Sequence, residues 1–178
     1  VYDKNIDASA FTALKTFGNM FGNNAFSFIR SFNNVNILHI EINYYKFIRL
    51  PNLEILNLEG NWQRPCKFNF VKGDFPKNLK ILRFRGCNRL FCKPYAIPLN
   101  LHTLDLDLWF NLPLEPNILP HNLHTLKFEE LYNIKFEQNI LPPNLRVLTL
   151  GKWYRQQFEP NILPPNLRVL TLGKWYRQ

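Results

Sequence analysis

The sequence of 178 residues is long enough for one domain, and its hydrophobic content of 46% is enough to bury a core, which argues against disorder. Polar residues or Pro interrupt every hydrophobic run before it reaches the roughly 20 apolar residues of a membrane-spanning helix, so no membrane partner is expected. The net charge of +9 comes from Lys and Arg scattered along the chain, so nucleic-acid binding is a secondary hypothesis.

The cysteines and the start of the chain bear on compartment and processing. Cys66, Cys87 and Cys92 are an odd number and too few for a disulfide framework, which favours a reducing compartment and a cytoplasmic location. Their spacing does not match a zinc site, so no metal and no other cofactor is predicted. The chain begins at Val1 without Met or a signal-peptide pattern, as a fragment or a processed product would.

The first 33 residues differ from the rest of the chain. Hydrophobic residues follow helical spacing at Phe11, Leu14, Phe17 and Phe21, and Asn and Gly at positions 22 to 24 end that pattern. The sequence therefore predicts a short helical N-terminal cap over residues 1–33.

Residues 34–178 read as seven repeat units. The segment 136–156, FEQNILPPNLRVLTLGKWYRQ, returns at 158–178 with Pro160 in place of Gln138 as its one difference. The kernel Asn-Leu-x-x-Leu-x-[Leu/Phe] recurs every 22 residues from position 78 onward, and two looser units precede it. The kernel Asn residues lie at 34, 52, 78, 100, 122, 144 and 166. A fixed period of this length predicts a solenoid of stacked units.

Each unit is predicted to supply one short strand. Alternation in 148–150 sends Leu148 and Leu150 to one face of the strand and Thr149 to the other. A lone strand of this length cannot bury its apolar side, so successive strands must pair in parallel over a shared leucine core. We predict one curved parallel sheet whose seven strands are centred near residues 38, 56, 82, 104, 126, 148 and 170.

The segments between strands, on the convex side, are predicted to be irregular or 3-10. A Pro lies one or two residues before the kernel Asn in six units and disfavours helix there. We interpret the Asn as a structural residue that hydrogen-bonds backbone groups at this corner. Two series at 22-residue intervals should fill the opposite wall of the core: Leu114, Phe136 and Phe158, and Ile118, Ile140 and Ile162.

The motifs FEQNI at 136–140 and FEPNI at 158–162, each followed by Leu-Pro-Pro-Asn-Leu and then Leu-x-Leu, resemble the FNIP repeat, a leucine-rich-like unit of 22 residues. Both FEQNI and FEPNI depart from the family's order Phe-Asn-x-Pro-Ile, because the Asn follows the Gln or Pro instead of preceding it. The resemblance implies a leucine-rich-repeat-like solenoid over residues 34–178, with no catalytic residues. Such repeats are best known from social amoebae and giant viruses of amoebae, often behind an F-box. The resemblance therefore also implies substrate recognition for a ubiquitin ligase.

Little in the sequence supports catalysis. The three serines lie outside any Gly-x-Ser-x-Gly motif, and the glycines form no phosphate-binding loop. His102 and His124 take the kernel position that Arg146 and Arg168 take in later units, which is typical of exchangeable surface residues. We predict that the protein is not an enzyme.

The outward face of the middle strands is the first candidate for binding a partner protein. In the predicted register it presents six charged residues: Arg83, Arg85, Asp105, Asp107, Lys127 and Glu129. A solvated face whose opposite charges neutralise one another across strands explains the same pattern equally well.

An aromatic ridge just past the strands is the alternative candidate. It comprises Trp109, Trp153, Tyr154, Trp175 and Tyr176. With Arg155 and Arg177 alongside, these rings would stack on the bases of single-stranded nucleic acid.

The last unit has no successor in the sequence, so the solenoid is predicted to be truncated or uncapped at its C-terminal end. The strand near Leu170 would then have unpaired backbone groups that invite self-association. The leading hypothesis is a protein-protein interaction module, and the alternative is a basic nucleic-acid binder.

Overall fold

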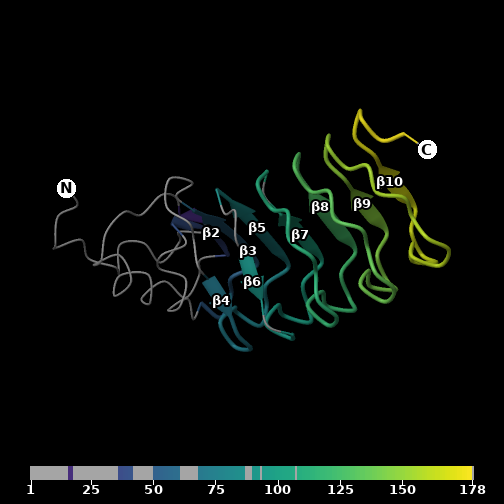
Figure 1. The fold of residues 1–178 in the computed structure, drawn as a ribbon. Coiled ribbons are helices and arrows are strands. Elements are labelled where there is room, and N and C mark those ends of the chain that lie inside the picture. Colours follow the sequence, from purple (N-terminus) through teal and green to yellow (C-terminus); the bar gives the residue numbers. More distant parts are fainter. Residues whose placement is uncertain are drawn as a thin grey trace, which may run out of the picture.

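The computed structural model describes residues 16–17, 36–41, 50–60, 68–86, 90–92, 94–106 and 108–177. Within them, the turns of the chain follow one another along a single axis, and each contributes one strand to a common sheet (Figure 1). All neighbouring strands are parallel, and the sheet has the order β1-β2-β3-β5-β7-β8-β9-β10. The bounds are β1 Thr16–Phe17, β2 Ile37–Glu41, β3 Ile55–Glu59, β5 Ile81–Arg85, β7 Thr103–Leu106, β8 Thr125–Phe128, β9 Val147–Thr149 and β10 Val169–Thr171.

The seven predicted strands and their register are confirmed. The central Leu of each strand lies opposite the central Leu of the next, in the series Leu38, Leu56, Leu82, Leu104, Leu126, Leu148 and Leu170. The first six are at most 1% exposed, because each is covered by a unit on either side. Leu170 is only partly buried, since β10 is the edge strand of the sheet.

The helical cap predicted for residues 1–33 is not confirmed. The described residues of that range, Thr16 and Phe17, form β1, which pairs in parallel with Ile37 and Leu38 of β2. An extended segment at this position pairs with backbone groups that the edge of β2 would otherwise leave open, and a helix cannot do so. Helical spacing is therefore wrong for these two residues, and the other predicted cap residues lie outside the described ones.

A β-turn leads into the strands of the units from Pro76 onward, and Pro occupies its first position. The amide of Leu79 donates to the carbonyl of Pro76 at 3.2 Å, and the same bond recurs in the four later units. The kernel Asn joins neighbouring units at this corner: Nδ2 of Asn78 donates to the carbonyl of Pro51 at 2.7 Å. Equivalent bonds run from Asn100 to Lys77 and from Asn166 to Pro143. The structural interpretation of the Asn is confirmed in these units.

A second turn occupies the opposite corner of the later units. Asn117, Asn139 and Asn161 have φ between 62° and 65°, the left-handed region, where Asn is better tolerated than most residues. In the unit at 115–118 the amide of Ile118 donates to the carbonyl of Glu115 at 3.4 Å. The Asn of the FEQNI and FEPNI motifs therefore serves backbone geometry.

The segments between the strands are irregular, with turns and bends, and the described residues contain no helix. They do contain a second sheet that the sequence did not indicate, in which β4 (Phe68–Phe70) pairs in parallel with β6 (Leu90–Cys92). The longer spacing of 26 residues between Asn52 and Asn78 leaves room for β4. Phe70 is fully buried and packs on Phe75, with ring centroids 4.7 Å apart.

Candidate partner-binding surfaces

The outward side chains of the main sheet form a continuous column with one residue from each strand. The paired positions are His39, Asn57, Arg83, Asp105, Lys127, Thr149 and Thr171. The register therefore brings together the members of this column that the sequence proposed as partner-binding residues.

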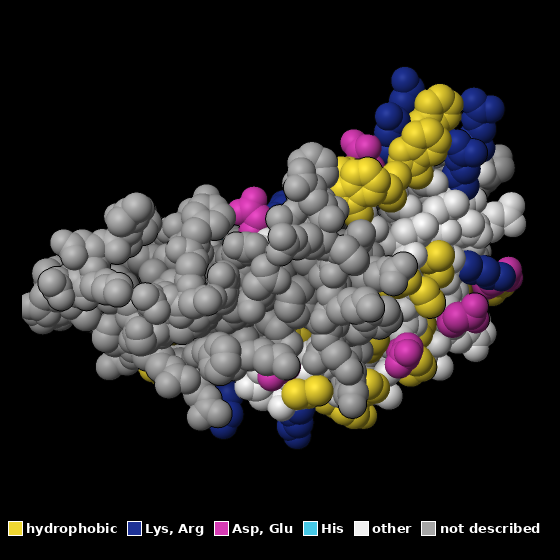
Figure 2. Space-filling view, turned by 60° about the vertical axis from the view of Figure 1, so that its left-hand side comes forward, with side chains coloured by type: hydrophobic (Ala, Val, Ile, Leu, Met, Phe, Trp, Pro, Cys, Tyr) yellow, Lys and Arg dark blue, Asp and Glu magenta, His cyan; other side chains and the backbone are white. Residues whose placement is uncertain are grey.

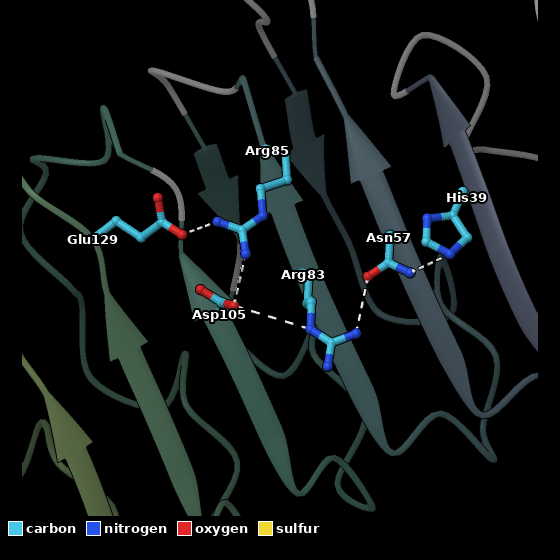
Figure 3. A network of polar contacts seen from close by, with 6 residues as sticks. All are labelled: His39, Asn57, Arg83, Arg85, Asp105 and Glu129. Carbon is cyan, nitrogen blue, oxygen red and sulfur yellow. Dashed lines mark hydrogen bonds and ion pairs between the residues drawn. The ribbon is translucent and has the colours of Figure 1, made fainter. Parts of the chain in front are cut away.

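Arg85 connects charged residues of three units. Its Nη1 pairs with Oε1 of Glu129, and its Nη2 lies 3.1 Å from Oδ2 of Asp105 (Figure 3). Nε of Arg83 lies 4.0 Å from the same carboxylate oxygen. Two guanidinium groups and two carboxylates therefore neutralise one another on the outward face.

The network continues toward the N-terminal strands through uncharged groups. Nη1 of Arg83 donates to Oδ1 of Asn57 at 3.2 Å, and the amide nitrogen of Asn57 lies 3.1 Å from Nε2 of His39 (Figure 3). This chain of contacts fixes the side chains of β2, β3 and β5 relative to one another.

Asp105 departs from the expectation that this column is solvated, because it is 7% exposed. The side chains of Arg83 and Arg85 interact with it and are themselves only partly exposed. Lys127 is exposed, and within the described residues it forms no ion pair. Asp107, the remaining proposed residue, lies outside the described residues.

The predicted aromatic ridge divides into two columns that face opposite ways. Tyr154 is fully buried and belongs to a ladder with Phe110, Tyr132 and Tyr176, in which successive ring centroids are 5.9 to 6.2 Å apart. Residues 151–154 form a β-turn in which the amide of Tyr154 donates to the carbonyl of Gly151 at 3.2 Å. Trp153 lies at the corner of this turn and stays exposed, whereas Tyr154 lies where the chain leaves the turn and packs in the core. Tyr154 is therefore wrong as a base-stacking residue, and partly buried Tyr176 packs against the core beside it.

Burial also changes the acidity of this ladder. Desolvation raises the pKa of the Tyr132 and Tyr154 phenols well above their ordinary value, and the next Tyr in the ladder raises each pKa further. Both phenols stay neutral in the folded protein at physiological pH.

The outer column leaves two of its Trp side chains exposed, and the third, Trp175, is partly exposed. Trp109 is 44% exposed and Trp153 is 39% exposed. The rings of Trp153 and Trp175 stack with centroids 6.1 Å apart. Figure 2 shows hydrophobic side chains raised as a ridge toward one end of the solenoid, with Lys and Arg on both sides.

Basic side chains lie directly over these Trp rings. Nζ of Lys152 and Cζ of Arg155 are each 5.5 Å from the ring centroid of Trp153. Nζ of Lys174 is 5.8 Å from that of Trp175. Both lysines belong to the repeated Gly-Lys-Trp-Tyr-Arg segment, and the sequence alone does not show that they lie over the rings.

A surface recess of about 300 Å³ adjoins the stacked rings and is lined by Arg155, Trp175 and Arg177. Gly151 and Gly173 occupy equivalent positions in the last two units and have no room for a side chain. A Cβ on Gly151 would overlap the carbonyl oxygen of Glu129, and a Cβ on Gly173 would overlap the carbonyl oxygen of Gly151. Small residues here allow the units to stack closely.

The described residues offer no group of three or more His, Cys, Asp or Glu side chains that is arranged to hold a metal ion. The same residues contain no helix that is long and apolar enough to cross a membrane.

The chain is similar to known proteins both in sequence, over one segment, and in fold. Residues 132–174 match the family described as FNIP Repeat, which confirms the resemblance of this segment. The fold is similar to the crystal structure of CroV588, described as a novel circular LRR protein, with a TM-score of 0.69 and 24% identity. The similarity covers 82% of this chain but only 22% of CroV588. A search of curated proteins finds no sequence match.

Proposed function

We propose that the chain is a non-catalytic module that binds another protein. The observation that carries the proposal is the outward column, in which parallel strands present one side chain each along a rigid stack of units. Such a surface contacts an extended partner at many points and loses little conformational freedom on binding. The leucine-rich-repeat-like fold is typical of protein-interaction modules and of non-enzymatic scaffolds.

The proposed docking area is the middle of this face, over β5, β7 and β8. Ion pairs hold Arg83 and Arg85 in place before a partner arrives, which lowers the entropic cost of binding. Lys127 lies beside them, exposed, and supplies a cation to an acidic or polar group of the partner. Asp105 and Glu129 act by positioning the two arginines.

The test is the affinity of the module for a protein captured from the source cell. Lys127→Glu should weaken binding by about tenfold or more, because it reverses a charge in the docking area without breaking an ion pair among the described residues. Arg146→Glu is the matched control, since Arg146 is also exposed but lies just before β9, outside the outward column. Unchanged affinity in Lys127→Glu would exclude docking on this face.

The FNIP match supports a finer proposal, that the module selects substrates for a ubiquitin ligase when it is joined to an F-box in the cytoplasm. Co-purification of the full-length natural protein with cullin-ligase subunits tests this. If the full-length protein lacks such partners, the binding role loses its link to ubiquitin ligation.

Self-association through β10 also stays a proposal. Val169 in this edge strand is 48% exposed, and an added strand would bury it. Sedimentation velocity should show a mass that rises with concentration, and Val169→Lys should abolish that rise.

A further inference from the structure

Four cations of the last two units are arranged differently from the arginines of the central face. Together with two Trp residues they form what we term the basic tryptophan ridge: Lys152, Trp153, Arg155, Lys174, Trp175 and Arg177. Its four cations are all exposed and, in the part of the chain that the structure describes, none of them forms an ion pair. Their charge is therefore available to a ligand.

The indole rings hold three of the four cations at defined positions. Lys152 and Arg155 lie over Trp153, and Lys174 lies over Trp175, at 5.5 to 5.8 Å from the ring centroids. A cation over an aromatic face is stabilised by the ring quadrupole, which restricts the flexible Lys and Arg side chains before any ligand binds. The ridge is thus a preorganised site for negative charge.

The repeat sets the spacing between these positions. The ring centroids of Trp153 and Trp175 are 6.1 Å apart, so we expect cations held over successive rings to have a similar spacing. In an extended peptide, alternate side chains point to the same side and lie about 6.6 Å apart, twice the rise per residue. An extended chain with an acidic residue at every second position therefore matches the ridge unit by unit.

We propose that the basic tryptophan ridge binds an extended acidic segment of a partner protein. Alternate Asp or Glu side chains pair with the cations of successive units, and the recess between Arg155, Trp175 and Arg177 receives one of these carboxylates. Arg suits this role, because its guanidinium can bind a carboxylate through two parallel hydrogen bonds. The site is separate from the central strand face and does not depend on docking there.

Single-stranded nucleic acid is the other anionic class to consider, and the geometry favours it less. Base stacking needs an open ring face, whereas the ring of Trp153 already meets Lys152, Arg155 and Trp175. The Tyr154 ring, which would have widened the stacking platform, is buried in the core.

The experiment measures binding of a fluorescent peptide of alternating Glu and Gly by anisotropy. The wild-type protein should bind it saturably and with a change in Trp fluorescence. Arg155→Glu combined with Arg177→Glu should lower the affinity by about tenfold or more. The matched control combines Arg146→Glu with Arg168→Glu, which makes the same change of charge at exposed positions of the same two units. The control should bind within about twofold of wild type.

Three results would overturn the proposal. Equal loss in both double variants would mean that net charge alone attracts the peptide. Tighter binding of an oligothymidylate of the same charge would assign the ridge to nucleic acid instead. Undetectable peptide binding by the wild type would remove the site. If the Glu variants unfold, Lys152→Gln combined with Lys174→Gln provides the same test. Lys127→Glu separates this site from the central strand face: it should leave peptide binding unchanged, whether or not a partner docks on that face.

Discussion

The central strand face and the basic tryptophan ridge are both rich in Lys or Arg, but only on the central face are arginines paired with carboxylates of the protein itself. On the central face Arg85 meets Asp105 and Glu129 in neighbouring units. In the last two units the outward strand positions hold Thr149 and Thr171, so the same scaffold supplies no carboxylate there. Equivalent positions recur in every unit of a solenoid, but the residue at each position varies. That residue determines whether a neighbouring charge is paired within the protein or remains available to a partner.

The same contrast appears between consecutive residues of one unit. Trp153 is 39% exposed and carries two cations over its ring, whereas Tyr154 is fully buried in an aromatic ladder. One is positioned to contact a ligand and the other stabilises the stack. Substitutions can therefore separate binding from folding within two adjacent positions.

The largest effect on stability is expected for Tyr154→Ala. Removal of this buried ring leaves a cavity between Tyr132 and Tyr176 and should lower the free energy of unfolding by about 3 to 5 kcal/mol. Trp153→Ala, at the exposed neighbour, should cost about 1 kcal/mol or less. Chemical denaturation of both variants measures the difference, and equal losses would contradict the assignment of inner and outer columns.

A smaller effect is expected for Asp105→Ala on the central face. The change leaves Arg83 and Arg85 without their shared carboxylate and should cost about 1 to 3 kcal/mol, less than a fully buried pair because both arginines are partly exposed. Thr149→Ala is the control from the same column and should change stability by about 0.5 kcal/mol or less. A loss no larger than that of the control would show that this network is a solvated surface.

The smallest effect concerns the alkaline stability of the inner ladder. Because burial raises the pKa of Tyr132 and Tyr154, the unfolded state loses these protons near pH 10 while the folded state keeps them. The free energy of unfolding should therefore fall as pH rises above about 10.

Tyr132→Phe removes one of these phenols and should raise the alkaline midpoint of unfolding by a few tenths of a pH unit. Circular dichroism against pH measures the shift. Tyr95→Phe, at a side chain that is 57% exposed, should leave the midpoint unchanged. An alkaline midpoint that is the same in Tyr132→Phe and wild type would show that the ladder does not control this transition.

The repeat itself determined most of the architecture from sequence alone. The recurring kernel, spaced by 22 residues from position 78 onward, shows which Leu lies beside which, because units that share it pair in parallel with equivalent positions side by side. That is why the positions of seven strands, the leucine core and the corner Asn could be predicted. The same recurring kernel carries the resemblance to the FNIP repeat, which the family match over residues 132–174 confirms for that segment.

Tertiary structure decided the side-chain contacts between units that the repeat does not specify. No pattern in the sequence shows that Arg85 reaches across to Glu129, that Asp105 is covered by its partners, or that β4 and β6 form a second sheet. At Thr16 and Phe17 pairing with β2 prevailed over the helical spacing of Phe residues, since the edge of a sheet offers hydrogen bonds that local preference cannot supply. The direction of Tyr154 was likewise set by the stack, where a buried ring gains contacts on both sides, while the Trp beside it stayed at the surface with its cations.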